Sequence, residues 1–124
     1  MTTTKKRVDV VYTRVDTQHK KNIKELGLQL DKVKDYAISQ IPNNLLEISE
    51  ISYNNKNNRP ELLQLIDLVA DNKINRVFVE SPNILIGSGF DYIKRMFNRL
   101  GTEIIFVDEE LQKETQKDEE ASED

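Results

Sequence analysis

The chain of 124 residues has no cysteine, which excludes a disulfide framework and a thiolate zinc site. It has no apolar run near the roughly 18 residues that a membrane span needs, and residues 1–7 lack the apolar core of a signal peptide. Gly87 and Gly89 belong to neither of the glycine-rich patterns that cradle phosphates, Gly-x-Gly-x-x-Gly and Gly-Lys-Ser/Thr. We therefore expect a soluble cytoplasmic protein with no metal site, no cofactor and no contact with membranes.

Charge is distributed unevenly along the chain. Residues 108–124 carry nine acidic side chains and two lysines, a net charge of −7, whereas the whole chain has −4, so that residues 1–107 sum to +3. Because the length suits one domain, we expect a single folded domain over 1–107 and an acidic, disordered tail over 108–124. The basic residues gather near the N-terminus: Lys5, Lys6, Arg7, Arg14, Lys20, Lys21 and Lys24. Such a group can meet phosphate or can be an ordinary solvated face.

Hydrophobic periodicity predicts alternating strands and helices. The expected strands lie at the start of Val8–Gln18 and over Leu45–Ile51, Ile74–Glu80 and Thr102–Val107; the expected helices are Gln18–Ile38, Pro60–Ala70 and Phe90–Leu100. The expected buried face of the first helix consists of Ile23, Leu26, Leu30, Val33 and Ala37. Gly101 is well placed to cap the last helix, and the second strand is interrupted by Glu47, Ser49 and Glu50. Strands separated by single helices pair in parallel through right-handed crossovers. The sequence thus predicts an α/β fold of three layers, helix–sheet–helix, with a mainly parallel four-stranded sheet and flavodoxin-like architecture.

Four short segments resemble the serine recombinases, the resolvase/invertase family, over about residues 7–109. The first reads Tyr12-Thr13-Arg14-Val15-Asp16-Thr17, where the family has a tyrosine, any residue and Arg-Val-Ser-Thr. Asn58-Arg59-Pro60-Glu61-Leu62 is similar to its Arg-Pro-x-Leu helix start, residues 73–79 to its third strand, and Ile104–Glu109 to its closing Phe-Val-Asp-Glu. The resemblance implies a resolvase-like fold and a catalytic arginine at Arg59, at the end of a mobile loop.

The resemblance also shows which catalytic residues of the family are replaced in this sequence. The nucleophilic serine of the family is replaced by Asp16, and its Asp-Arg-Leu-x-Arg segment reads Asn83-Ile84-Leu85-Ile86-Gly87, without either arginine. Cleavage of a DNA diester needs cations that neutralise the charge developing on the phosphoryl oxygens. We therefore expect no activity from the degenerate catalytic positions, which are Tyr12, Arg14, Asp16, Arg59, Asn83, Ile84 and Gly87.

Other roles remain open for the polar residues of this region. Arg14 and Arg59, with Lys20 and Lys21, can form a leftover contact to phosphate or to the DNA backbone, or Arg14 can pair with Asp16. That aspartate can instead cap the following helix.

Two further interpretations of Asp16 have less support. A phosphoacceptor aspartate of the receiver type would need an acidic pair after Tyr12 and a lysine after Val107, and the sequence has neither. A metal-dependent nuclease using Asp16 and Glu80 has no supporting spacing.

Two functional hypotheses follow. The first is a non-catalytic interaction or regulatory module in DNA recombination or a related mobile-element process, which associates with itself or with another protein and binds DNA weakly. The second is a nucleic-acid-processing enzyme with a rebuilt site at Arg14, Asp16 and Arg59. In the family the last strand leads into a long helix that dimerises the protein and crosses DNA. Leu111 is the only large apolar residue after Val107, so we expect no amphipathic dimer helix here.

Overall fold

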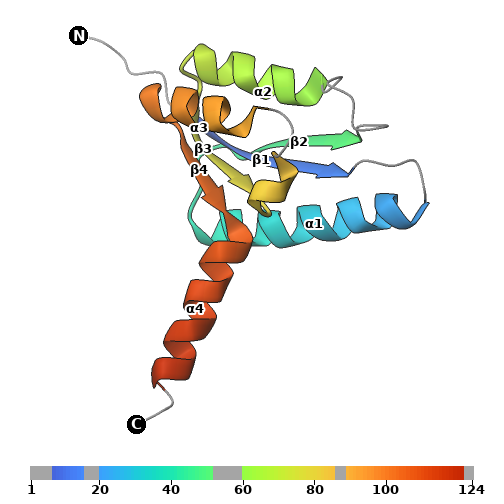
Figure 1. Ribbon diagram of the computed structural model, residues 1–124, viewed down its shortest axis with the longest axis vertical. Helices are drawn as coiled ribbons and strands as arrows, with labels where there is room; N and C mark the ends of the chain where they lie inside the picture. Colours follow the sequence, from blue (N-terminus) through green and yellow to red (C-terminus); the bar gives the residue numbers. More distant parts are fainter. Residues whose placement is uncertain (1–6, 16–19, 52–59, 86–88, 122–124) are drawn as a thin grey trace.

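A computed structural model describes residues 7–15, 20–51, 60–85 and 89–121 of the chain, and shows a sheet between two layers of helices (Figure 1). The elements in chain order are β1 (Val8–Val15), α1 (Lys20–Ser39), β2 (Leu46–Ile51), α2 (Pro60–Ala70), β3 (Ile74–Val79), the 3₁₀ turn η2 (Pro82–Ile84), α3 (Phe90–Arg99), β4 (Glu103–Phe106) and α4 (Val107–Ala121). The sheet has the order β2-β1-β3-β4. All three strand pairs are parallel, which confirms the predicted fold class.

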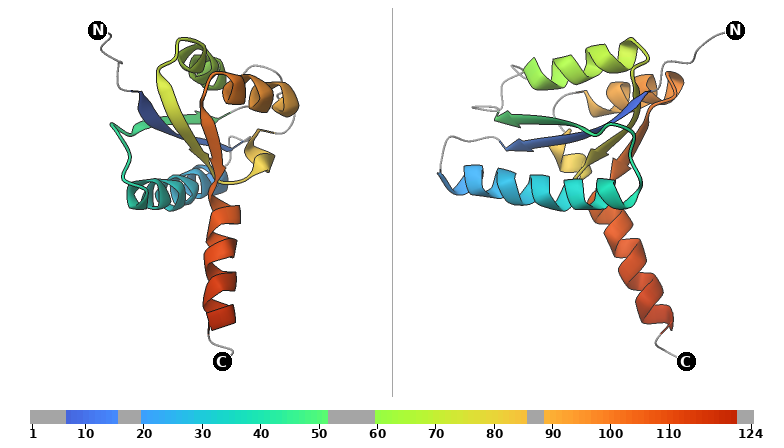
Figure 2. Two further views of the ribbon diagram at one scale, coloured as in Figure 1. Left: turned by 90° about the vertical axis from the view of Figure 1, so that its left-hand side faces the viewer. Right: turned by 180° about the vertical axis from the view of Figure 1, so that it is seen from behind.

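The core lies on both faces of this sheet because neighbouring side chains of a strand point to opposite sides. Val10 and Tyr12 of β1 belong to the apolar cluster that includes α2 and α3 residues, whereas Val11 packs with Val33 and Ala37 of α1. Figure 2 shows α2 and α3 together on one face and α1 on the other. The parallel strands therefore end at one common edge, the carboxyl edge.

Helix α1 buries only part of the apolar row that its sequence predicts. Val33 and Ala37 are fully buried, but Ile23 is 53% exposed, so its predicted place on the buried face is wrong. The first turns of α1 extend past the end of β1 and have no strand to pack on (Figure 1).

The opposite, amino edge of the sheet is held by paired charges. Asp9 is fully buried and accepts hydrogen bonds from Arg76 at 3.2 and 2.9 Å, from the Asn43 N–H at 2.9 Å and from Asn75 at 3.3 Å. Burial by itself raises the pKa of Asp9, but the hydrogen bond from Arg76 and the remaining contacts lower it below its ordinary value.

Arg7 belongs to the same edge and not to a free basic patch. Its guanidinium donates to the carbonyl oxygens of Leu100 and Gly101 at 2.6 and 2.9 Å, and to Asn72 at 3.2 Å. It thereby satisfies carbonyls at the end of α3. Gly101 has a φ of +77°, as predicted for the residue that caps this helix.

The C-terminal segment differs from its prediction. Residues 108–124 are expected to be a disordered tail after a strand that reaches Val107, but β4 ends at Phe106 and α4 runs from Val107 to Ala121. Acidic residues at 108–110 favour the helix N-terminus, and Lys113 reaches Glu110 at 3.2 Å. Val107 is fully buried and Leu111 packs partly against the α1 layer, which fixes the start of the helix.

No helix among the described residues is both long enough and apolar enough to cross a membrane.

Candidate functional site

The candidate site lies at the carboxyl edge of the sheet, where β1, β2 and β3 end. Of the residues expected there, Tyr12, Arg14, Asn83 and Ile84 are described, whereas Asp16, Arg59 and Gly87 lie outside the described residues. Lys20 and Lys21 form the first turn of α1, but their side chains are outside the description too. The carboxyl edge of an open α/β sheet is where ligands bind.

Arg14 is half-buried near the end of β1, and its Nε atom is buried without a hydrogen-bond partner among the described residues. Its backbone is fixed by the Gln29 side chain of α1, which accepts from the Arg14 N–H at 2.9 Å and donates to the Arg14 carbonyl at 3.1 Å. Native proteins satisfy nearly all buried polar groups, and an unsatisfied donor costs about 1–3 kcal/mol. A guanidinium held in this way can donate to an anion such as phosphate.

Tyr12 and Glu50 form a buried pair beside this arginine. The Tyr12 hydroxyl donates to Glu50 Oε1 at 2.5 Å, and both residues are almost completely buried, at 0% and 2% exposure. Glu50 Oε2 accepts the Glu61 N–H at 3.1 Å, which places a carboxylate at the N-terminus of α2 where the helix dipole favours it. The pair therefore fixes the start of α2, directly after the segment that contains Arg59.

The turn η2 directs its apolar residue into the core. Ile84 is 8% exposed and Leu85 2%, and both belong to the cluster of Tyr12 and Leu62, whereas Asn83 is exposed. Position 84 is one of the two places where the resemblance implies a catalytic arginine. The side chain that stands there contributes packing and no charge.

Glu80, the possible metal ligand, is engaged in an ion pair. Lys32 of α1 lies 2.7 Å from Glu80 and 2.8 Å from Asp108, and the Asp108 N–H donates to the Glu80 carbonyl at 3.0 Å. Burial lowers the pKa of Lys32, but hydrogen bonds to Asp108 and Glu80 raise it above its ordinary value. The described residues contain no group of three or more His, Cys, Asp or Glu side chains that could hold a metal ion.

The sequence interpretation missed two residues of this region, Gln29 and Glu50. Glu50 interrupts the apolar pattern of its strand, which weakens the prediction of a strand, yet its side chain is buried and paired. Gln29 lies beside the apolar row of α1, between Leu26 and Val33. A polar residue next to the buried face of an element is the only sequence signal that could have identified either one.

Comparison with known proteins identifies a family and solved structures with the same fold. Residues 10–123 match the family model described as Resolvase, N terminal domain. The structure is similar to the C-terminal catalytic domain of ISC1926 TnpA, an IS607-like serine recombinase, with a TM-score of 0.71 and 25% identity over 80% of this chain and 66% of that one. Comparison with curated proteins gives no match.

Two further solved structures share the fold. A serine recombinase from Sulfolobus solfataricus has a TM-score of 0.69 and 23% identity, and the similarity covers 89% of this chain and 78% of that one. The N-terminal catalytic domain of TP901-1 integrase has a TM-score of 0.68 and 23% identity, covering 82% and 78%. The chain thus spans about two thirds to four fifths of these structures.

Proposed function

The chain belongs to the serine recombinase family defined by the resolvase N-terminal domain, and we propose that it has lost DNA strand cleavage and acts as a non-catalytic interaction and regulatory module in DNA recombination. The module would associate with a recombinase-fold protein, a second copy of itself included. Solved relatives include an IS607-like serine recombinase and a protein described as the first ORF in transposon ISC1904, which supports a role in a mobile-element process.

The burial of Ile84 is the observation that carries this proposal. Strand cleavage needs a guanidinium near the scissile phosphate at this position, and the residue present is instead 8% exposed within an apolar cluster. The loss of one well-placed donor costs about 10²–10³ in rate. Because Gly87 lacks the second guanidinium, the deficit would be about 10⁴–10⁶ if the two effects were independent.

The nucleophile position adds to the deficit. Asp16 offers a carboxylate in place of the serine hydroxyl, and a carboxylate of pKa about 4 is a weak nucleophile toward a phosphodiester. Its negative charge also opposes the approach of phosphate. The chain would therefore keep the recombinase fold and its association surfaces but would not cleave DNA strands.

Arg14 supports a residual contact with phosphate. Its buried Nε has no partner among the described residues, and a DNA backbone or another anion could supply one. This observation also favours the second candidate function, a nucleic-acid-processing enzyme with a rebuilt site at Arg14, Asp16 and Arg59.

A plasmid assay separates the two functions. Supercoiled plasmid is incubated with the wild type, with and without Mg²⁺, and with the Asp16→Ala and Asp16→Ser variants. We expect no nicking by any of them, and Asp16→Ser is the sharper arm because it restores the hydroxyl while positions 84 and 87 still lack a cation. Nicking by the wild type that disappears in Asp16→Ala would establish the rebuilt enzyme and refute the interaction module.

A further inference from the structure

Helix α3 carries a basic and aromatic outer face, opposite its buried residues Ile93 and Phe97. The α3 basic face consists of the residues that line a surface hollow of about 750 Å³: Asp91, Tyr92, Lys94, Arg95, Asn98 and Arg99. All six are exposed, and the exposed fraction of Tyr92 is 82%. The face is therefore open to a partner from outside the fold.

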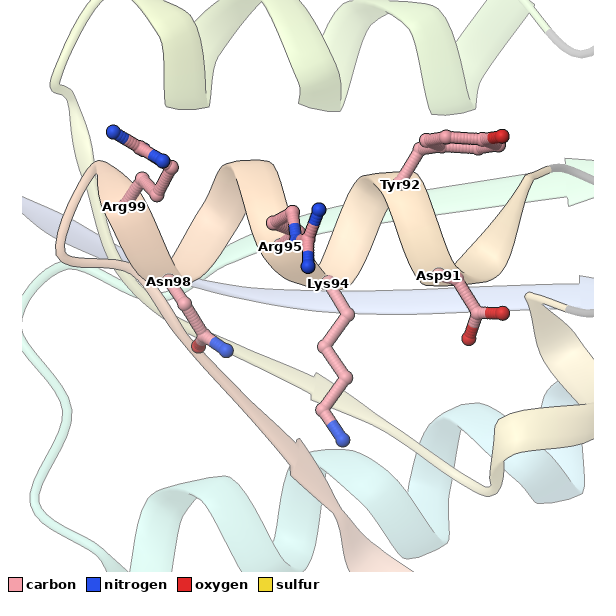
Figure 3. Close-up of a pocket in the computed structure, with 6 residues that line it drawn as sticks. All are labelled: Asp91, Tyr92, Lys94, Arg95, Asn98 and Arg99. Carbon is pink, nitrogen blue, oxygen red and sulfur yellow. The ribbon is translucent and has the colours of Figure 1, made fainter.

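The tyrosine and two of the cations form one row on this face. Tyr92, Arg95 and Arg99 follow each other at intervals of three and four positions, which places them along one side of the helix. Figure 3 shows Tyr92 and Arg99 on the side of α3 toward α2 and Asp91 on the other side, with Arg95 between them. The row thus combines an aromatic ring with two guanidinium groups and contains no acid.

The charges of the α3 basic face are not used within the fold. Three cations and one acid give it a net charge of +2, and Lys94, Arg95 and Arg99 make no ion pair with any residue that the structure describes. At the amino edge, by contrast, Arg76 is paired with Asp9. The α3 cations are therefore available to an anionic ligand.

The acidic helix α4 does not cancel this charge. It carries seven acidic residues and two lysines, a net charge of −5. Figures 1 and 2 show that α4 leaves the body on the side away from α2 and α3. Exposed charges more than about 10 Å apart are largely screened at 0.1 M salt. An anionic chain that lies on α3 is thus attracted by the α3 cations, although the whole protein has a net charge of −4.

We propose that the α3 basic face binds single-stranded nucleic acid, with an unpaired base stacked on Tyr92 and the neighbouring phosphates bound by Arg95 and Arg99. Every base has a face that can stack on an aromatic ring, and arginines bind the phosphates of the same strand. Arg99 lies seven positions after Tyr92, about 10 Å along the helix, which corresponds to about three nucleotides of a stacked strand. The inference goes beyond the proposed function, since it needs neither a recombinase-fold partner nor the carboxyl edge of the sheet.

Duplex DNA is the first competing partner. Its bases are paired and stacked on each other, so the Tyr92 ring can reach the face of a base only where a base step is opened, which costs free energy. An unpaired strand offers the same phosphates without that cost. The exposed ring therefore favours a single strand.

An acidic protein segment is the second competing partner. Tyrosine and arginine are frequent in protein interfaces, but the centre of such an interface is apolar and depleted of charged residues. Tyr92 is the only large hydrophobic side chain that is exposed on α3, and three cations share the face with it. The α3 basic face thus lacks the apolar centre of a protein interface.

The test is fluorescence anisotropy of the full chain with labelled oligonucleotides of about 12 nucleotides: oligo-dT, oligo-U and a DNA duplex. We expect both single strands to bind, and at least about tenfold more tightly than the duplex. A preference between oligo-dT and oligo-U distinguishes DNA from RNA as the source of the strand. With about two or three phosphate contacts, the dissociation constant should rise about 25- to 100-fold between 50 and 500 mM NaCl.

A charge variant tests the phosphate contacts. In Arg95→Gln/Arg99→Gln two contacts are lost, so the dissociation constant should rise less than about fivefold over the same range of salt. The matched control removes two exposed cations elsewhere, Lys24→Gln/Lys73→Gln, and should keep the salt dependence of the wild type.

A second variant tests the stacking and separates it from charge. Tyr92→Ala should raise the dissociation constant for oligo-dT about 5- to 100-fold without changing its salt dependence, and Tyr92→Phe should restore binding to within about threefold of the wild type. An abasic strand should bind equally to the wild type and to Tyr92→Ala. Leu28→Ala, which removes a side chain that is 61% exposed on α1, is the control and should bind like the wild type.

Five results would overturn the inference: no binding of either single strand at 50 mM NaCl, a duplex bound as tightly as a single strand, wild-type binding by Tyr92→Ala, an unchanged salt dependence in Arg95→Gln/Arg99→Gln, or displacement of the strand by polyglutamate as effectively as by an unlabelled strand of equal charge. The last result would identify an acidic protein segment as the partner. None of these measurements depends on plasmid nicking or on self-association, so the failure of this site and the failure of the proposed function are distinguishable.

Discussion

The two edges of the sheet differ in whether their buried charged groups have hydrogen-bond partners. At the amino edge Asp9 receives four hydrogen bonds, two of them from Arg76, and Arg7 saturates the carbonyls that end α3. At the carboxyl edge the buried Nε of Arg14 has no partner among the described residues, although its backbone is held at both ends by Gln29. The same fold thus pairs Arg76 with a buried carboxylate at the amino edge and leaves the Nε of Arg14 without a described partner at the carboxyl edge.

This difference separates stability from function. A buried charge with a full set of partners is retained because the loss of any one partner is costly. A positioned donor without a partner destabilises the folded chain when nothing is bound, and such groups gather where ligands bind. The amino edge should therefore dominate the free energy of unfolding, and the carboxyl edge should govern the response to anions.

The largest effect is expected at Asp9. Asp9→Asn removes the charge that pairs with Arg76 and replaces one acceptor oxygen by a donor, so the free energy of unfolding should fall by about 3 kcal/mol. Urea denaturation measures it. The matched control, Asp67→Asn, changes an exposed aspartate of α2 and should stay within about 0.5 kcal/mol. A loss at Asp9 no larger than at Asp67 would remove the distinction between the two edges.

The pH dependence of stability provides a second measure of the same pair. Because the folded state lowers the pKa of Asp9, its stabilising contribution is fully present above the unfolded pKa of about 3.9 and is lost as the pH falls through the lower folded value. The wild type should therefore lose stability relative to Asp9→Asn as the pH drops below about 4. Parallel profiles of the two proteins between pH 6 and pH 3 would contradict the pairing.

An intermediate effect is expected at Glu50, inside the carboxyl edge. Glu50→Gln keeps the size of the side chain but replaces one of its two acceptor oxygens with an NH₂ donor. Either the bond from the Tyr12 hydroxyl or the bond from the Glu61 N–H is then lost. We expect a loss of about 1–3 kcal/mol, measured by urea denaturation. Glu47→Gln, at an exposed position of the same strand, is the control. A neutral Glu50→Gln would mean that the buried pair does not fix the start of α2.

The two edges also differ in how far the sequence predicts them. The strand and helix order follows from apolar periodicity, because period-2 and period-3.6 patterns reflect burial directly. The start of α2 at Pro60 and the capping position of Gly101 follow from backbone chemistry that needs no partner. These features are local, and each was predicted correctly.

Side-chain pairing across elements could not be predicted in the same way. Glu50 contacts Tyr12, 38 positions away in the sequence, and Gln29 contacts Arg14, 15 positions away. The hydrophobic pattern of the sequence does not say which residues of two different elements lie next to each other. The start of the acidic segment 108–124 depends on a related kind of contact. Its low hydrophobicity indicated disorder, whereas buried Val107 and the Lys32–Asp108 ion pair fix its first turn from outside the segment.

The smallest effect on stability is expected at Arg14, where a small effect would distinguish a ligand-binding residue from a structural one. Arg14→Met removes a buried donor that no described residue satisfies, which stabilises the fold, but it also loses part of the side-chain packing. Because these two effects oppose each other, the free energy of unfolding should change by less than about 1 kcal/mol. Added inorganic phosphate should stabilise the wild type, since a ligand that binds only the folded state raises its stability by RT ln(1 + [L]/Kd), and it should not stabilise Arg14→Met. Arg76→Met at the amino edge is the matched contrast: it should lose about 3 kcal/mol and keep the phosphate response of the wild type. If Arg14→Met were as destabilising as Arg76→Met, Arg14 would be a structural residue. Its Nε atom would then be no evidence for an anion-binding site at the carboxyl edge.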